Sequence, residues 1–137
     1  MSFNAYLMFA GNCREAFTRY NEIFGGELTL LTAGDVPPGA DAPPGDPNLI
    51  MHAALKVGDA LLMASDDPTV ETAKPVEGMQ VSYGTNDADE ARRVFAALAE
   101  GGNVTMPISE TFWSPAFGMC VDRFGTPWMV SAEGPQA

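Results

Sequence analysis

The sequence predicts an α+β fold made of two copies of one βαβββ unit, because one series of signals occurs twice in the same order. Residues 12–29 contain a helix N-cap residue, a glutamate three positions later, an apolar stripe and a Gly-Gly pair, and residues 87–105 contain the same features. A strand-like run precedes each segment, and further strand-like runs follow it. A long repeat of mixed content indicates two α/β units rather than a solenoid, which needs three or more shorter units.

Both helices are predicted from their start and stop signals. Asn12 and Asp87 are good N-cap residues, and Glu15 and Glu90 stand where a capping box needs an acidic residue. Glycine accepts the left-handed conformation that ends many helices, and it occurs at Gly25-Gly26 and Gly101-Gly102. Between these signals the apolar residues recur at helical spacing, so each helix is expected to pack on a sheet.

Strand-like runs and breakers complete the two units. The strands are predicted at residues 3–10, 27–32, 50–57, 60–66, 79–85, 103–106, 117–122 and 127–132. Gly58 and Asp59 predict a two-residue hairpin loop, in which glycine supplies the positive φ of a type II′ turn. Proline and glycine make 35–48 a long loop and 107–115 a second loop. We therefore expect one domain over residues 1–137, with module one at 1–66, a linker at 67–78 and module two at 79–133.

Composition narrows the class of partner. Eighteen acidic against seven basic residues disfavour nucleic acid and anionic membranes, since phosphate binding draws on Lys and Arg. No apolar run approaches the roughly 18 residues that cross a membrane, and the N-terminus lacks the pattern of a signal peptide. Two cysteines are too few for a disulfide scaffold. We expect a cytoplasmic protein with no nucleic-acid or membrane partner.

Several motifs follow one another along the chain: Tyr6–Ala16 with Phe24–Gly26, His52–Leu55, Leu62–Asp66, Asp87–Ala91, Thr111–Trp113, and Phe117-Gly118 followed by Asp122–Trp128. Taken together, these motifs resemble the PhnB-like family of the vicinal-oxygen-chelate superfamily. The resemblance implies the glyoxalase/bleomycin resistance/dihydroxybiphenyl dioxygenase fold, whose paired modules curl mixed sheets around a cavity, and it implies a homodimer. It leaves the reaction open, because the superfamily includes lyases, dioxygenases, transferases and plain binding proteins.

The resemblance also identifies the positions where metal-dependent members carry His, Glu or Gln. In this sequence those positions are Ala5, Met63, Gln80 and Met129. Alanine has no donor atom, and thioethers are soft ligands that do not suit Mn²⁺, Fe²⁺ or Mg²⁺. We therefore expect no metal site and no cofactor. The chain also lacks a glycine-rich strand-to-helix loop suited to a methyl-donor cofactor.

His52 is the only imidazole of the chain. Counting outward from the hairpin loop pairs Ala54 with Met63 and His52 with Ser65, so His52 is expected on the same face as Met63. Asp66 or Asp67 could orient the ring. Three roles compete: a hydrogen-bonded structural histidine, a ligand-contacting or acid–base histidine, and a metal ligand.

Side-chain alternation predicts a ligand-binding set that is mostly apolar and rich in methionine. Its members are Ala5, Leu7, His52, Met63, Ser65, Gln80, Ser82, Trp113 and Met129. Such a lining fits an uncharged or aromatic small molecule, although the same residues could form a filled core. Trp113 could instead pack at a dimer interface, Trp128 is expected to be structural, and Cys13 lies where a helix dipole could lower its pKa.

Two functions follow as hypotheses. The first is a metal-independent small-molecule-binding protein of the glyoxalase/bleomycin-resistance type. The second is an enzyme, a lyase or transferase of the superfamily, that uses His52 as its acid–base group, with Gln80 and Ser82 polarising the substrate. We also expect a homodimer, because the first strand would leave an open sheet edge and the aromatic residues near Trp113 would be partly exposed.

Overall fold

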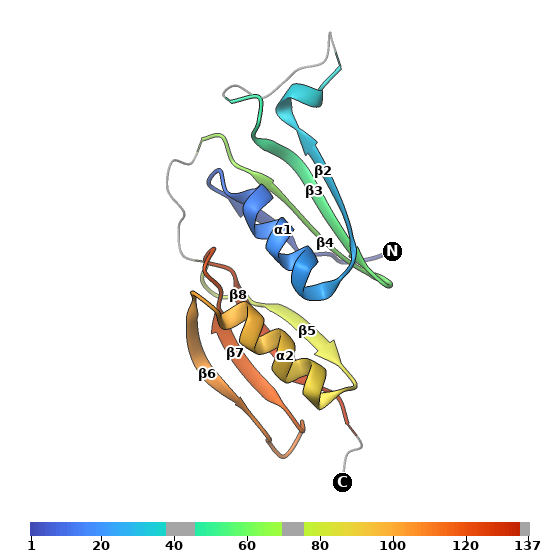
Figure 1. Cartoon of the computed structure of the whole chain (residues 1–137), viewed down its shortest axis with the longest axis vertical. Helices are drawn as coiled ribbons and strands as arrows, with labels where there is room; N and C mark the ends of the chain where they lie inside the picture. Colours follow the sequence, from blue (N-terminus) through green and yellow to red (C-terminus); the bar gives the residue numbers. More distant parts are fainter. Residues whose placement is uncertain (38–45, 70–75, 135–137) are drawn as a thin grey trace. The chain divides into compact units, whose positions relative to one another are not determined.

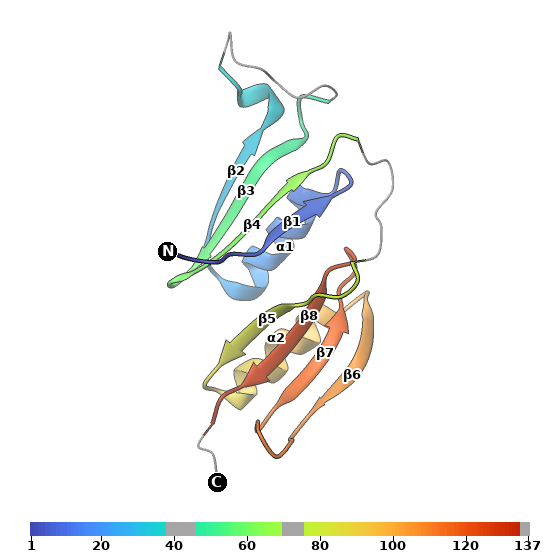
Figure 2. The ribbon, with the colours of Figure 1, turned by 180° about the vertical axis from the view of Figure 1, so that it is seen from behind.

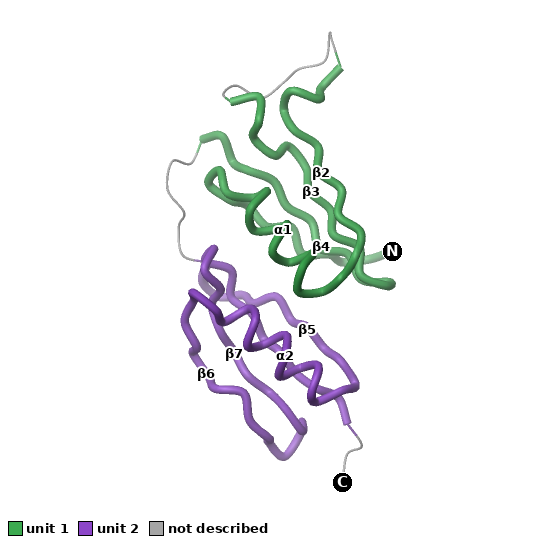
Figure 3. Tube along the Cα trace, viewed as in Figure 1, with its two compact units in different colours: residues 1–73 green, residues 74–137 purple. Residues whose placement is uncertain are grey.

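The computed structural model describes residues 1–37, 46–69 and 76–134. The chain divides into two compact units, Met1–Ala73 and Lys74–Ala137 (Figure 3). In the described residues, each unit is a four-stranded mixed sheet with one α-helix, so the predicted α+β fold of two βαβββ modules is confirmed. That the modules join through a linker at 67–78 into one domain stays a prediction.

The first unit follows the predicted order of elements. They are β1 (Tyr6–Phe9), α1 (Cys13–Phe24), β2 (Glu27–Thr32), the 3₁₀ turn η1 (Ala33–Asp35), β3 (Ile50–Val57) and β4 (Ala60–Asp66). The sheet order is β1-β4-β3-β2, with β1 parallel to β4 and the other neighbours antiparallel. Helix α1 lies across one face of this sheet (Figure 1).

The second unit repeats this topology. Its elements are β5 (Val81–Thr85), α2 (Ala88–Ala99), β6 (Asn103–Ser109), β7 (Phe117–Val121) and β8 (Pro127–Ala132). The sheet order is β5-β8-β7-β6, with β5 parallel to β8 (Figure 2). Helix α2 covers one face of this sheet. Within the described residues, no helix is both long and apolar enough to cross a membrane.

Most strand bounds agree with the prediction to within two residues, but β1 begins at Tyr6 instead of residue 3 and β6 ends later than expected. Strand β6 runs on to Ser109, into the loop expected at 107–115. It is an edge strand, where Pro107 removes no ladder bond that the sheet needs. The predicted hairpin is confirmed, since Val57 pairs with Ala60 and Gly58 has a φ of +59°. Of the loop expected at 35–48, residues 38–45 lie outside the described part of the chain.

Each helix buries one apolar stripe against its own sheet. In α1 the buried residues are Cys13, Ala16, Phe17, Tyr20 and Ile23, and in α2 they are Ala91, Val94, Phe95 and Leu98. Phe17 meets Phe9 of β1 edge-on, with ring centroids 6.2 Å apart. Burying a side chain of this size contributes roughly 1.5–3 kcal/mol. Trp128 is 2% exposed, as expected for a structural residue.

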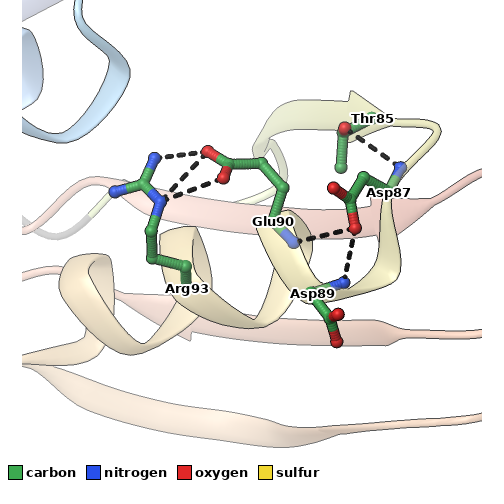
Figure 4. Close-up of polar contacts among 5 residues, drawn as sticks. All are labelled: Thr85, Asp87, Asp89, Glu90 and Arg93. Atoms are coloured by element: carbon green, nitrogen blue, oxygen red, sulfur yellow. Dashed lines mark hydrogen bonds and ion pairs between the residues drawn. The ribbon is translucent and has the colours of Figure 1, made fainter.

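The two helices begin differently, although their sequences look alike. Asp87 caps α2 as predicted, because its Oδ1 accepts from the N–H groups of Asp89 (2.9 Å) and Glu90 (3.3 Å) (Figure 4). The Glu90 carboxylate binds Arg93 instead of closing a capping box, and Arg93 lowers the pKa of Glu90. The Asn12 side chain makes no cap hydrogen bond, so the prediction that Asn12 caps α1 through its side chain is wrong.

Candidate functional site

The candidate residues of the first unit gather on the sheet face that α1 does not cover, which we name the helix-free face. Tyr6 of β1 pairs with Met63 of β4, and Met63 pairs with Ala54 of β3. Directly opposite residues point to the same side, and residues two apart on one strand share a face. His52 therefore lies on the same face as Met63, and this expectation is confirmed.

Tyr6 makes the specific contact on this face. Its hydroxyl lies 3.2 Å from Nδ1 of His52, and the two ring centroids are 5.8 Å apart. The hydrogen bond fixes the imidazole and leaves Nε2 as the ring nitrogen for any further partner. His52 is half-buried, and Tyr6 is 44% exposed. Beside them, the Ser65 hydroxyl donates to the Met8 sulfur at 3.5 Å.

The expected face of the first strand is wrong by one residue. Leu7 pairs with Ala64, which is fully buried, and it shares its face with Phe9, which packs on Phe17 of α1. Leu7 therefore lies on the helix side, and Tyr6 takes the place on the helix-free face. Ala5 precedes β1, and its carbonyl accepts from the N–H of Met63 at 3.2 Å.

This error has a physical origin. The hairpin turn fixes the register between β3 and β4 locally, whereas β1 pairs with β4 across most of the unit, where no local turn sets the face. The available signal was Phe9, a large apolar residue beside the start of the helix.

Asp66 does not orient His52, contrary to expectation. Its carboxylate accepts from three backbone N–H groups, those of Gly11 (3.1 Å), Cys13 (2.9 Å) and Ile50 (2.8 Å). Asp66 is 6% exposed. It joins the start of α1 to the start of β3, so its role is structural.

The second unit places its candidates on the corresponding helix-free face. Ser82 pairs with Met129 and Gly84 with Ser131, so the predicted shared face of β5 and β8 is confirmed. Gln80 precedes β5, and its Nε2 donates to the Met119 sulfur at 3.2 Å. Met119 is itself opposite Met129.

Trp113 lies near this face, in the loop between β6 and β7. Its ring centroid is 5.4 Å from that of Phe117, which pairs with Ser131. Trp113 is 45% exposed, and its neighbour Phe112 is 96% exposed. Whether Trp113 and the other members of the set contact a ligand stays a prediction.

Both cysteines are free, buried and unsuited to nucleophilic chemistry. Burial, and to a smaller extent Asp66, raise the pKa of Cys13 from its ordinary value of 9.0 to about 12. Burial and Asp122 raise the pKa of Cys120 to about 11. The expectation that the helix dipole could lower the pKa of Cys13 is therefore wrong. Desolvation of the thiolate is the largest cause of the shift, and the opposing effect of the Arg14 charge is smaller.

The donor atoms at the metal positions of the superfamily do not fit a hard divalent ion. Two of the four residues offer thioethers, Ala5 offers no donor, and Gln80 alone offers a hard donor, its amide oxygen. Among residues 1–37, 46–69 and 76–134, no three His, Cys, Asp or Glu side chains lie together in a way that could hold a metal.

Comparison with known proteins gives consistent matches. A family model described as 3-demethylubiquinone-9 3-methyltransferase matches residues 1–131. Protein YjdN of Escherichia coli (strain K12) is 32% identical over 145 residues, which cover 99% of this chain and 98% of YjdN. The crystal structure of protein PA1353 from Pseudomonas aeruginosa is 45% identical, with a TM-score of 0.87 and 98% of each chain covered.

More distant structures share the fold. The PhnB protein from Bacillus cereus is 23% identical, with a TM-score of 0.78, over 96% of this chain and 99% of that one. The fosfomycin resistance protein FosX from Listeria monocytogenes is 8% identical, with a TM-score of 0.62, over 96% of this chain and 92% of FosX. That FosX structure contains Mn(II) and dihydroxypropylphosphonic acid.

Proposed function

Because this chain belongs to the 3-demethylubiquinone-9 3-methyltransferase family, whose PhnB-like members have the vicinal-oxygen-chelate fold, we propose that it binds an uncharged or aromatic small molecule without a metal. The family description is not an argument for methyl transfer here. The sequence has no glycine-rich strand-to-helix loop of the kind that a methyl-donor cofactor needs.

The observation that carries this proposal is the chemistry of the helix-free faces. At the centre of the first face, Tyr6, His52 and Met63 lie together, and the charged pair Glu27 and Lys56 lies at the hairpin end of the sheet. On the second face the neighbours are Ser82, Met119, Met129 and Ser131. These side chains offer shape-adaptable thioethers and a few hydrogen-bonding groups, which suit a neutral ligand.

The binding proposal is tested by a small-molecule screen on the whole protein, read out as a shift in thermal midpoint. We expect ligands without net charge to stabilise the wild type and His52→Ala to lose this shift. Lys56→Gln, on the same strand and face but at the hairpin end, is the matched control and keeps it. A screen in which His52→Ala responds like the wild type contradicts the proposed site.

Metal independence has its own test. Elemental analysis of the purified protein is expected to find no stoichiometric Mn, Fe, Ni or Zn. A near-stoichiometric amount of one of these metals, retained after dialysis against a chelator, overturns this part of the proposal.

A second candidate, favoured by the contact between Tyr6 and His52, is an enzyme whose acid–base group is His52. A hydrogen bond to Nδ1 orients the ring and tunes Nε2, the atom that would exchange a proton with a substrate. If the screen finds a substrate, Tyr6→Phe should change the pH profile of turnover, and His52→Ala should remove turnover. Full turnover by a folded His52→Ala protein excludes this candidate.

We also propose that the protein forms a homodimer. Strands β1 and β5 are edge strands, paired on one side only within the described residues, and Phe112 and Trp113 are exposed. A two-fold partner could cover such edges and aromatic side chains. Light scattering over a dilution series tests this, and a mass that stays at 14.5 kDa at micromolar concentration refutes it.

A further inference from the structure

Three methionines form a row across the helix-free face of the second unit. Met106 of β6 pairs with Met119 of β7, and Met119 pairs with Met129 of β8. Met119 and Met129 lie in a regular register, in which opposite Cβ atoms are about 4.5–5.5 Å apart, whereas the register of β6 shifts on both sides of Met106 and only its pairing places Met106 beside Met119. Three neighbouring strands therefore present three thioethers side by side, and we name this set the methionine row.

The methionine row is accessible and adaptable. Met106 is 40% exposed, and Met119 and Met129 are half-buried. A methionine side chain has three rotatable bonds, so neighbouring sulfurs can turn toward a common point. The Met119 sulfur accepts a hydrogen bond from Gln80 at 3.2 Å, which shows that it is directed to an accessible polar neighbour rather than into the core. A second lone pair on that sulfur remains.

The chemistry of the row selects one class of ligand. Thioethers are soft, uncharged donors that bind Cu(I) and comparable ions well and hard divalent ions poorly. The protein carries a net charge of −11, which raises the local concentration of cations. A soft monovalent cation therefore suits both the thioether donors and the negative electrostatic potential of the protein.

We propose that the methionine row of Met106, Met119 and Met129 is a binding site for a soft monovalent cation such as Cu(I). The site lies within one unit and does not depend on the small-molecule ligand proposed above. It shares Met129 with the divalent-metal positions of the superfamily, but it differs from them in chemistry because all three of its donors are thioethers.

Both thiols and the exposed Met8 are weaker competitors for a soft ion than the methionine row. The thiols of Cys13 and Cys120 are 0% and 1% exposed, and their raised pKa values keep them protonated. Met8 is more exposed than Met106, but its partner across the sheet is Ser65 rather than a second methionine. Met8 is therefore a matched control: the same thioether at the surface, without the row.

The direct test is a titration of the whole protein with Ag(I), a soft monovalent ion that does not change oxidation state. In protein labelled with ¹³C at the methionine methyl groups, the signals of Met106, Met119 and Met129 are expected to shift together and to saturate at a single ion per chain. The signal of Met8 is expected to move little. Equal shifts of Met8 and the row overturn the proposal.

Affinity for Cu(I), measured by competition with a chromophoric chelator under reducing conditions, gives a second readout. Met119→Leu is expected to weaken binding at least about tenfold, whereas Met8→Leu leaves it unchanged. Leucine nearly conserves the volume of methionine. Should Met119→Leu fail to fold, Met106→Leu on the edge strand is the substitute. Wild-type affinity in a folded row variant refutes the site.

The pH dependence of cation affinity distinguishes the methionine row from donors that can be protonated. Thioethers do not titrate, so binding is expected to be as tight at about pH 5 as at about pH 7, whereas an imidazole site would weaken as its ring protonates. Loss of affinity at the lower pH assigns the ion to a donor that takes up a proton, the His52 imidazole or a cysteine thiolate, and overturns the proposal.

Discussion

The two units begin their helices from nearly the same sequence pattern but hold them by different means. Helix α1 depends on Asp66, which comes from the end of β4 and accepts from the N–H of Cys13. Helix α2 is capped by Asp87, the residue directly before it. The last residue of β8, where β4 has Asp66, is Ala132. The same fold thus tolerates a distant cap in one copy and a local cap in the other.

The second unit uses a buried aspartate elsewhere. Asp122 is 5% exposed and accepts from the N–H groups of Phe124 (2.9 Å) and Thr126 (3.0 Å) and from the indole Nε1 of Trp128 (2.8 Å). It therefore fixes the turn between β7 and β8. Among the residues that the structure describes, each unit has one buried carboxylate that organises its backbone, but only the first unit uses it to start a helix.

The largest expected effect concerns the thiols, of which each unit buries one. With the pKa of Cys13 raised from 9.0 to about 12, its reaction with a disulfide reagent near pH 8 should be about a thousandfold slower than that of an ordinary thiol. Cys120, with a pKa of about 11, should react faster than Cys13. Timed labelling followed by mass spectrometry measures both rates. Rapid modification of Cys13 in the native protein would contradict this order.

The same shifts predict an alkaline limit of stability. The folded state binds the thiol protons more tightly than the unfolded state, so the free energy of unfolding should fall as pH rises from 9.0 toward about 12. Cys13→Ala should flatten this fall, which denaturation at several pH values would reveal.

Next in size, Asp66→Ala should destabilise the first unit by at least about 3 kcal/mol. The substitution removes the acceptor of three buried N–H groups, and each donor left unsatisfied costs about 1–3 kcal/mol. Denaturant unfolding followed by hydrogen exchange would locate the loss in residues 1–69. A loss confined to the second unit would contradict the assignment.

Gly26 and Gly102 test what the two units share. A Cβ at Gly26 would meet the carbonyl oxygen of Lys56, and a Cβ at Gly102 that of Val121. Backbone atoms cannot yield as a flexible side chain would, so alanine at either position should cost about 1–3 kcal/mol. Similar losses in the two variants are expected from denaturation curves. A neutral substitution at one position alone would show that the helix–strand contact is not equivalent.

The smallest effect separates the local caps. Asp87→Ala should cost about 1 kcal/mol, as loss of an N-cap does, whereas Asn12→Ala should change stability by less than about 0.5 kcal/mol because Asn12 caps nothing. Thermal unfolding of both variants measures the difference. Equal losses would mean that the α1 start relies on Asn12 after all.

These contrasts show what the sequence could and could not reveal. The repeat, the hairpin at Gly58 and the cap at Asp87 depend on residues close in the chain, and each was predictable. The role of Asp66 and the face of Leu7 depend on pairing between the first and last strands of a unit, for which the large apolar Phe9 was the only local hint. For the same reason Tyr6 escaped prediction, although His52, its partner, was placed correctly.

That pairing of first and last strands also has a consequence for how the chain is made. Tyr6 can pair with Met63, and Val81 with Trp128, only after nearly the whole unit has been synthesised. Contacts so far apart in sequence slow folding, because the chain loses loop-closure entropy before such contacts can stabilise it. On the ribosome, residues 1–57 would have to wait with β1 unpaired until β4 emerges. A nascent chain stalled before β4 is then the state most exposed to aggregation and to chaperones.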